Sequence, residues 1–390
     1  MKILVESEDK VAVNFELEAN LEEEVEVSVV IPSKDEEETI GVCINKIRKV
    51  FESGGVVGEI IVSDSSKDRT PIIAKKLGAK VVTPDRKGYG YAYTYGFRHV
   101  KGKYVVIGDA DDTYDFTEMP RLLEPLMKGE ADLVIGSRFK GKIEKGAMPW
   151  HHRWIGNPAL TWFLNFFFKA GVSDAHSGFR AITKEALERL NLDAEGMEFA
   201  SEMIIKAVDK GLRVKEVPIS YYKRRNNNSK LSSFQDGWRH LKFMLMYTPN
   251  YLFIYPGISL FLFGFLLMIF ALLNVYIGYV PGAHSMIAGS LLIIAGYQAL
   301  FFGLFAKVYR GKGVPRFLTL ERGAAAGILL FTAGIAYTSY LVLGWASSNF
   351  SSLPPIEIDI IGFTLIVIGI QTFFSSFMLS IIANGKRKEN

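Results

Sequence analysis

The chain has 390 residues and a formal net charge of +4, which is small for this length and gives no reason to expect a nucleic-acid partner. The length exceeds that of one ordinary domain, and the composition changes near Pro249. Before Pro249 charged residues are frequent and apolar runs are short, whereas long uncharged apolar runs follow it. We therefore expect a soluble α/β domain followed by a membrane domain.

The first 26 residues form an acidic extension without the apolar core of a secretory signal. We expect the first membrane span to act as the targeting signal instead. Cys43 is the only cysteine, so it has no partner for a disulfide within the chain. It lies among Ile40, Ile44 and Ile47, and this apolar pattern predicts a buried thiol.

Short apolar runs alternate with helical patterns from Glu26 to about Leu190, which is typical of a mainly parallel sheet flanked by helices. In open α/β sheets ligands bind beyond the carboxyl ends of the strands, so the polar residues that follow these runs predict one crevice. The glycine-rich signatures of dinucleotide folds and P-loops are missing, which argues against a dehydrogenase or an ATPase. The expected strands are Val27–Pro32, Glu59–Ser63, Lys80–Thr83, Tyr104–Gly108 and Leu133–Gly136.

Two carboxylates, Asp109 and Asp111, bracket one small residue directly after the apolar run Tyr104–Gly108. Mg²⁺ or Mn²⁺ commonly binds one or two such carboxylates together with substrate phosphates. The pair therefore predicts a metal site that holds a diphosphate. An Asp-x-Asp pair alone is a weak signal, and the alternative is a polar turn that caps the next helix.

Seven short motifs follow one another in a fixed order between Val27 and Leu231. They are Val29-Val30-Ile31-Pro32 with Glu36, Asp64, Lys87-Gly88-Tyr89-Gly90, Asp109-Ala110-Asp111, Gly136-Ser137-Arg138, Ser177-Gly178-Phe179-Arg180 and Ser229-Lys230-Leu231. In this order they resemble the family 2 inverting glycosyltransferases, specifically the polyprenyl-phosphate branch that includes dolichyl-phosphate mannose and glucose synthases. The resemblance implies a Rossmann-like nucleotide-sugar-binding domain and transfer of a hexose from a nucleotide sugar to a polyprenyl phosphate.

The resemblance also implies the residues of the donor site. Mannose synthases of this family often carry Gln where this chain has Thr113, so the resemblance favours UDP-glucose over GDP-mannose as donor. For Asp64 the alternative role is a helix cap. The nucleoside pocket would be lined by Pro32, Lys34, Glu36, Val62 and Asp64, with Asp109, Ala110 and Asp111 beside the ribose, the metal and the diphosphate.

A lipid phosphate needs fixed cations, and the planar fork of arginine meets phosphate oxygens in pairs. The family has an arginine five or six residues before the lysine of its last motif, and both Arg224 and Arg225 fit that position. The alternative for this group is a solvated basic loop. The candidates for the acceptor phosphate are Arg138, Arg153, Asn157, Arg224, Arg225 and Lys230.

Related enzymes are thought to use an acid at the position of Asp174 as a base or an orienting group. A phosphate monoester has a second pKa of about 6, so the acceptor oxygen is already an anion at neutral pH. Asp174 is therefore either catalytic or a structural group that orients Arg180 or the acceptor. Glu198 and Glu202, spaced i to i+4 on an expected helix, are further carboxylate candidates or part of an exposed helix face.

Four uncharged apolar runs after Pro249 are each long enough to span a bilayer. The segment between the second and third runs and the tail after the fourth are rich in Lys and Arg, so the positive-inside rule places both on the cytoplasmic side. The N-terminal domain and both termini are then cytoplasmic. The runs are roughly Leu252 to Leu273, Ala283 to Ala306, Gly323 to Ala346 and Ile360 to Ala383.

Two segments are too aromatic for the open surface of a soluble domain, and we expect both to lie on the bilayer. One is 150–170, in which His151 and His152 neighbour Trp150 and Trp154, and the other is an amphipathic helix at 234–250. The expected organisation is an acidic extension (1–26), a glycosyltransferase domain (27–233), the amphipathic helix (234–250), four spans (251–384) and a basic tail (385–390).

Two other functions remain as alternatives. A processive polysaccharide synthase would carry Gln-x-x-Arg-Trp, whereas Trp238 and Arg239 stand here in the reverse order. A lipid flippase or transporter with a regulatory soluble domain would be favoured by intramembrane charges, and the four runs contain none. Gly323 and Gly327 form a small-residue pair that suits either packing between spans or a homo-oligomer.

Overall fold

The computed structural model describes residues 24–225, 233–311, 313–314 and 318–387. Contacts divide the chain into two units, with the division between Met244 and Leu245. Lys230, one of the expected acceptor residues, lies outside the described residues, as do the basic residues at positions 312 and 316.

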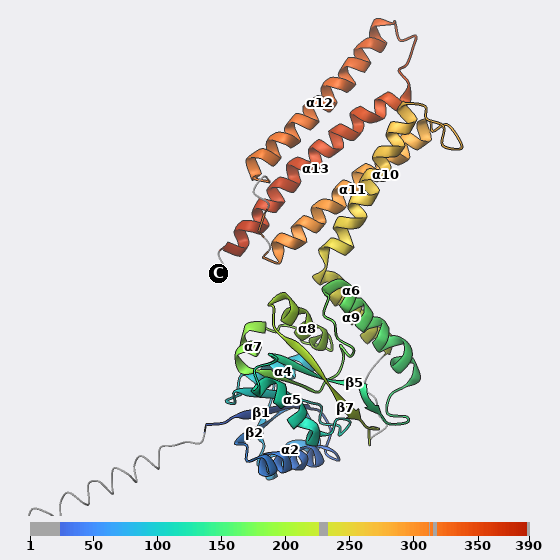
Figure 1. Cartoon of the computed structure of the whole chain (residues 1–390). Coiled ribbons are helices and arrows are strands. Elements are labelled where there is room, and N and C mark those ends of the chain that lie inside the picture. The colour runs from blue at the N-terminus through green and yellow to red at the C-terminus, as the bar shows by residue number, and fades with distance from the viewer. Residues whose placement is uncertain (1–23, 226–232, 312, 315–317, 388–390) are drawn as a thin grey trace, which may run out of the picture. The chain divides into compact units, whose positions relative to one another are not determined.

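The first unit is built on a seven-stranded sheet with the order β3-β2-β1-β4-β6-β5-β7 (Figure 1). Only β6 among these strands is antiparallel to its neighbours, β4 and β5. The mainly parallel α/β fold expected from the sequence is thereby confirmed. The strands are β1 (Val27–Ser33), β2 (Gly58–Asp64), β3 (Lys80–Val82), β4 (Tyr104–Ile107), β5 (Leu133–Ile143), β6 (Arg180–Thr183) and β7 (Val214–Tyr221).

Helices cover both faces of the sheet, because alternate residues of the central strands are apolar on each side. Val29 and Ile31 pack with Cys43 and the rest of α2 (Ile40–Gly54) on one face, and the thiol is fully buried as predicted. Val30 faces α4 (Tyr89–Phe97) on the other side, where a Cβ added at Gly96 would lie 2.6 Å from Val30 Cγ1. The other helices of the sheet domain are α3 (Thr70–Lys76), α5 (Met119–Met127), α7 (Lys184–Leu190) and α8 (Phe199–Asp209), with the short 3₁₀ helix η1 (Phe116–Glu118).

Two strands, β6 and β7, were not predicted. β6 has only four residues, which is too short for a periodic signal, and β7 contains Pro218. β7 is an edge strand that pairs only with β5 in the sheet. Proline has no backbone N–H to donate, so it is tolerated in an edge strand, where one side has no partner strand. β5 itself runs seven residues beyond the predicted Gly136, with an irregular register between Ser137 and Lys142.

The aromatic segment forms a π-helical turn, η2 (His152–Gly156), that continues into α6 (Asn157–Phe168). Its large side chains Trp150, Trp154 and Trp162 are exposed. The next aromatic segment lies on α9 (Ser233–Tyr247), where Trp238 is also exposed. Exposed tryptophans at this density are typical of a surface that meets lipid.

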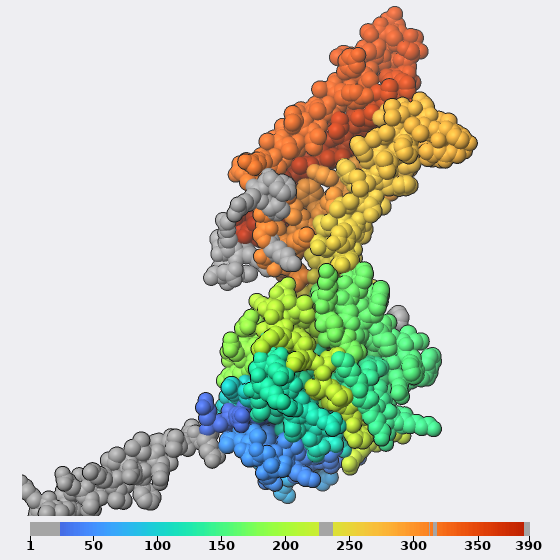
Figure 2. Space-filling view, in the orientation of Figure 1, coloured from blue at the N-terminus to red at the C-terminus, as the bar shows by residue number. Residues whose placement is uncertain are grey.

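The described residues of the second unit include four helices that are long and apolar enough to cross a membrane, as predicted. In Figure 1 they lie in a row, in which α11 and α13 are neighbours and α10 and α12 are the outer helices. Figure 2 shows the same helices as an elongated array, whereas the sheet domain is a rounded body. The elements are the π-helical turn η3 (Asn250–Ile254), α10 (Tyr255–Leu272), α11 (Ala283–Tyr309), α12 (Leu320–Ser347) and α13 (Ile356–Arg387).

Glycines let these helices approach closely. A Cβ at Gly327 of α12 would lie 2.9 Å from the carbonyl oxygen of Gly369 on α13, and one at Gly323 would lie 2.1 Å from Ser376 Oγ. The pair of small residues noted in the sequence thus packs α12 against α13 within the chain. Between α11 and α13 the hydroxyls of Tyr297 and Thr372 are 2.7 Å apart.

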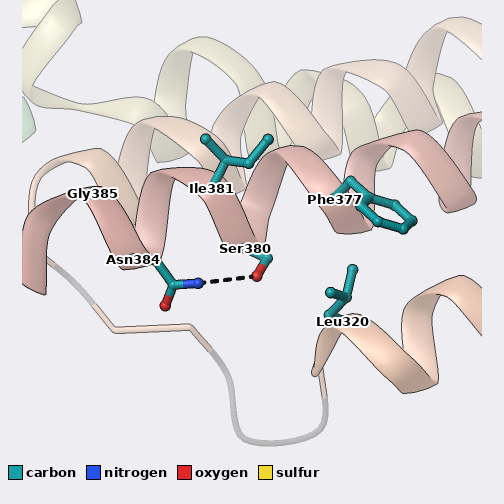
Figure 3. Close-up of a pocket in the computed structure, with 6 residues that line it drawn as sticks. All are labelled: Leu320, Phe377, Ser380, Ile381, Asn384 and Gly385. Atoms are coloured by element: carbon teal, nitrogen blue, oxygen red, sulfur yellow. Dashed lines mark hydrogen bonds between the residues drawn. The ribbon is translucent and has the colours of Figure 1, made fainter.

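A shallow groove of about 400 Å³ lies between the first turn of α12 and the end of α13 (Figure 3). One polar contact at its edge joins Asn384 Nδ2 to Ser380 Oγ at 3.4 Å. No charged side chain is among the described residues that line it. Its lining residues are Leu320, Phe377, Ser380, Ile381, Asn384 and Gly385.

Candidate active site

Asp109 and Asp111 lie on the loop that follows β4, and each is oriented through its Oδ1 atom. Asp109 Oδ1 accepts hydrogen bonds from the hydroxyls of Tyr89 (2.8 Å) and Tyr93 (3.5 Å), both on α4. Asp111 Oδ1 accepts from the backbone N–H (3.1 Å) and the hydroxyl (2.7 Å) of Thr113. Thr113, which stands where related enzymes often carry Gln, therefore orients one of the two carboxylates.

Burial and, to a smaller extent, the neighbouring charge of Asp111 together raise the pKa of Asp109 to about 7, against the hydrogen bond from Tyr89, which lowers it. Two carboxylates that resist being charged together form a site that a divalent cation stabilises. The described residues contain no cluster of three or more His, Cys, Asp or Glu suited to a metal. The pair therefore fits Mg²⁺ or Mn²⁺ shared with a diphosphate rather than a cage built by protein alone.

The Ser177-Gly178 motif lies directly against this pair. A Cβ added at Gly178 would be 2.7 Å from Asp109 Oδ2 and 3.2 Å from the hydroxyl of Tyr89. The backbone N–H of Gly178 donates to the hydroxyl of Tyr114 at 2.8 Å. Glycine is needed here because any side chain would displace the carboxylate.

The loops after β1 and β2, which were expected to bind the nucleoside, hold each other in place. The N–H of Asp35 donates to Ser66 Oγ at 2.7 Å, and the N–H of Lys67 donates back to Asp35 Oδ1 at 2.8 Å. The N–H of Glu36 donates to Thr70 Oγ1 at 2.9 Å. Asp35 has a φ of 52°, a left-handed conformation that Asp tolerates better than most residues.

The residues expected in the nucleoside pocket differ in how they are placed. Lys34 is exposed and Pro32 and Glu36 are half-buried on the β1 loop. Asp64 is buried, and its Oδ1 accepts from the hydroxyls of Ser33 (2.7 Å) and Ser66 (2.5 Å). Asp64 thus stabilises the paired loops, which is closer to the alternative capping role than to an open binding position.

Two side chains of the expected donor site belong to the hydrophobic core. Val62 is fully buried in it, because the alternation along β2 directs this residue toward the face covered by α2. The methyl group of Ala110 is buried in the same core, where its carbonyl oxygen lies 3.6 Å from Cys43 Sγ. Because both side chains are buried, a ligand can meet only the backbone atoms of these residues. The places expected for Val62 in the nucleoside pocket and for Ala110 beside the ribose, metal and diphosphate stay predictions.

The adjacent arginines after β7 take different partners. Arg224 contacts Glu36 through Nη2, and its Nε lies 3.6 Å from Asp111 Oδ2. Arg225 Nη2 lies 3.1 Å from Oδ2 of Asp112, the buried next residue of the same loop. Arg224 is 26% exposed and Arg225 57%, so Arg224 is the one that faces the carboxylate pair.

Arg138 on β5 forms a buried, two-point ion pair with Asp174. Its Nε and Nη2 donate to Asp174 Oδ2 (2.7 Å) and Oδ1 (2.8 Å), and its backbone N–H donates to Oδ2 (3.0 Å). The side chains are 7% and 0% exposed. Burial, the largest single influence, would lower the pKa of Arg138, but the charge and hydrogen bonds of Asp174 together with the nearby Tyr114 and Tyr221 outweigh it, and the net change is upward.

Asp174 therefore orients Arg138 and not Arg180. Arg180 is buried and donates to the carbonyl oxygens of Ser177 (2.8 Å), Ala200 (2.8 Å) and Ala175 (2.9 Å). It serves as a brace for the loop that carries Gly178.

Arg153 and Asn157 make contacts within their own aromatic segment. The Arg153 guanidinium lies 5.4 Å from the centre of the Trp154 ring, and Asn157 Nδ2 lies 3.5 Å from Met148 Sδ. Their expected role at the acceptor phosphate stays a prediction.

Glu198 and Glu202 hold a loop together. Glu202 is fully buried and accepts from the N–H groups of Asp193 (3.0 Å) and Ala194 (2.8 Å), with Lys206 Nζ 2.8 Å away. Glu198 accepts from the N–H of Gly196 at 3.2 Å. Glu202 therefore matches neither of the two alternatives drawn from the sequence, which were a place on an exposed helix face and a carboxylate available to the reaction.

One polar residue near the site, Glu216 on β7, was missed. Its carboxylate accepts three hydrogen bonds from the Ser173–Asp174 turn. A single Glu within the strand Val214–Tyr221 was the available signal, and it is too weak to separate a buried carboxylate from a solvent-facing one.

Comparison with known proteins agrees with this geometry. Residues 28–190 match the family model "Glycosyl transferase family 2", and residues 311–383 match "Glycosyltransferase family 2 C-terminal transmembrane region". The low-salt glycan biosynthesis hexosyltransferase Agl6 of Haloferax volcanii is 46% identical over 364 residues, which cover 90% of this chain and 88% of that protein. A dolichyl-phosphate hexose transferase of the same organism is 33% identical over 214 residues, covering 54% and 89%.

Among solved structures, glucosyl-3-phosphoglycerate synthase of Mycobacterium tuberculosis in complex with Mn²⁺, UDP-glucose and phosphoglyceric acid is 27% identical, with a TM-score of 0.48. The match covers 60% of this chain and 83% of that one. The two family models and the extent of the Agl6 match show the family of the chain. They argue against the alternative of a transporter with a regulatory soluble domain. The chain is a family 2 glycosyltransferase and an integral membrane protein.

Proposed function

We propose that this enzyme transfers a hexose from a nucleotide sugar to the phosphate of a polyprenyl or dolichyl phosphate, in a reaction that needs Mg²⁺ or Mn²⁺. The observation that carries the proposal is the approach of Arg224 to Asp111, with Nε 3.6 Å from Oδ2. It supports one crevice with anionic groups for a metal-bound donor and cationic groups for an anionic acceptor. The dolichyl-phosphate hexose transferase among the relatives supports the class of acceptor.

On the donor side Asp109 and Asp111 would hold the metal, kept in orientation by Tyr89 and Thr113. When bound, the metal would neutralise charge on the diphosphate leaving group. The loops after β1 and β2, which hold each other through hydrogen bonds, would form one side of the nucleoside pocket. Thr113, which replaces the Gln common in mannose synthases, favours UDP-glucose over GDP-mannose as donor.

On the acceptor side no strong base is required, because a phosphate monoester is already largely ionised at neutral pH. Arg138, Arg224 and Arg225 supply guanidinium groups that match phosphate oxygens. Asp174 is occupied by Arg138, which favours an orienting role over proton abstraction. Attack by the phosphate oxygen opposite the leaving diphosphate is a single displacement, so the anomeric carbon inverts.

The positive-inside rule favours a cytoplasmic catalytic domain, because the basic linker and basic tail flank the same ends of the spans. A reporter active only in the cytoplasm, fused after Asn390, is expected to be active. Activity of an external reporter at the same position would reverse the proposed orientation.

The donor and the acceptor are tested together by incubating purified full-length protein with a polyprenyl phosphate, Mg²⁺ or Mn²⁺, and labelled UDP-glucose or GDP-mannose in parallel reactions. Label is expected in the lipid fraction from UDP-glucose. Label that appears only from GDP-mannose would correct the donor, and label that accumulates as a water-soluble polymer would favour a polysaccharide synthase.

A further inference from the structure

Glu216 is a buried carboxylate whose contacts serve one turn of the chain. Its Oε1 accepts from the N–H of Ser173 (2.8 Å), the hydroxyl of Ser173 (3.1 Å) and the N–H of Asp174 (3.0 Å). The side chain is 4% exposed, and Lys140 Nζ lies 2.8 Å from Oε2. A carboxylate that satisfies consecutive backbone N–H groups fixes the direction of the peptide between them.

The turn held by Glu216 is the one that presents Asp174 to Arg138. Asp174 takes Nε and Nη2 of the guanidinium, and it also accepts the backbone N–H of Arg138. Arg138 therefore receives its orientation from Asp174, and Asp174 receives its own from Glu216. The guanidinium of Arg138 also lies over the ring of Tyr221, with 5.2 Å between the guanidinium carbon and the ring centre. This contact helps to fix the plane of the guanidinium.

A second link ties the same turn to β5. The hydroxyls of Ser137 and Ser173 lie 2.7 Å apart, and the N–H of Lys140 donates to Ser137 Oγ at 3.2 Å. The link falls where the register between β5 and β7 becomes irregular. Bulges of this kind re-aim side chains next to active sites.

We propose that Glu216 is a positioning residue for the acceptor site: by clamping the Ser173–Asp174 turn it fixes the guanidinium of Arg138 in the direction that meets the lipid phosphate. The proposal rests on the acceptor role proposed above for Arg138. Glu216 touches neither substrate, so its loss acts through Arg138. The consequence is a change in acceptor recognition rather than in donor binding.

The test compares two variants of Glu216 in full-length enzyme. Glu216→Ala removes the carboxylate oxygen that accepts all three hydrogen bonds from the turn. The KM for polyprenyl phosphate is then expected to rise about 10- to 100-fold, which is the effect of moving a binding group by about 1 Å. Glu216→Gln keeps an oxygen for the three donors, and its acceptor KM is expected to stay within about fivefold of wild type. The KM for the nucleotide sugar should be unchanged in both.

A control is available at an ion pair next to Glu216. Lys215, next to Glu216 on β7, pairs with Glu130 at 2.8 Å, and both side chains are about half exposed. Glu130→Gln removes this Glu–Lys pair without touching the turn, and it is expected to leave both KM values within about twofold of wild type.

Hydrogen exchange gives a readout that does not depend on turnover. The amides of Ser173 and Asp174 should exchange faster in Glu216→Ala than in Glu216→Gln or wild type, because the first variant removes their acceptor. If Glu216→Ala fails to fold, Ser173→Ala serves as the second variant, because it removes the hydroxyl contacts with Glu216 and Ser137 and keeps both backbone N–H contacts with Glu216. That variant is expected to raise the acceptor KM about three- to tenfold.

Equal acceptor KM values in active wild type, Glu216→Ala and Ser173→Ala would overturn the positioning role, as would equal increases in the donor and acceptor KM. A wild-type enzyme that transfers no sugar to polyprenyl phosphate would instead overturn the proposed function. These outcomes separate the two proposals.

Discussion

The buried ion pair between Arg138 and Asp174 allows a quantitative prediction. Asp174→Asn is nearly isosteric, but it leaves the Arg138 guanidinium, only 7% exposed, without its counter-charge. Breaking a buried ion pair by removing one partner costs about 3–5 kcal/mol. For a domain of this size, with about 2–4 °C per kcal/mol, the melting temperature should fall by about 10 °C.

The assay measures the melting temperature of the sheet domain in the purified, detergent-solubilised protein. Transfer activity is measured in parallel. The double variant Asp174→Leu, Arg138→Met replaces both partners and leaves no unpaired charge. It should recover much of the stability that Asp174→Asn loses, while transfer is lost in both variants. An Asp174→Asn variant with an unchanged melting temperature and normal transfer would refute the assignment of Asp174 as the partner that orients Arg138.

Three further outcomes test the site. Asp111→Ala should abolish transfer and leave the melting temperature almost unchanged, because Asp111 lies on a partly exposed loop; transfer at the wild-type rate would remove the metal hypothesis. Arg225→Ala should raise the KM for the lipid about tenfold and leave the donor KM unchanged, which steady-state kinetics with each substrate varied would show. The pKa of Asp109 is raised to about 7, so below that pH its proton competes with the cation. Metal affinity measured by calorimetry should therefore fall about fivefold from pH 7 to pH 6 and level off above about pH 8. A constant affinity over this range would contradict the role of Asp109 as a ligand. In Tyr89→Phe, which lacks the hydrogen bond that lowers this pKa, the fall should begin at higher pH.

The sequence predicted the central strands and the spans because both depend on local patterns. The strands Val27–Ser33 and Gly58–Asp64 each contain an apolar run and lead into polar loops, which is typical of strands covered on both faces. The spans follow from length and hydropathy alone. β6 and β7 depend on pairing with β5, and that pairing leaves little trace in four residues or in a strand containing Pro218.

Within the site, the residue types were predictable and their partners were not. Asp109 and Asp111 follow a strand, so their position in the crevice could be read from the chain. The pairing of Asp174 with Arg138 joins residues 36 positions apart, and that of Glu216 with Ser173 joins residues 43 apart. Such pairs are set by tertiary packing. Val62 shows the converse, since it lies in the apolar run of a strand covered on both faces, where every apolar side chain is expected to be buried.

The most direct test of the account is mass spectrometry of the lipid recovered after wild-type enzyme has been incubated with polyprenyl phosphate, UDP-glucose and Mg²⁺ or Mn²⁺. The account predicts a polyprenyl phosphate that has gained one hexose, that is absent when the metal is chelated, and that is absent with Asp111→Ala. An unmodified lipid with every donor and metal tried, from a protein that is folded and binds nucleotide sugar, would contradict it.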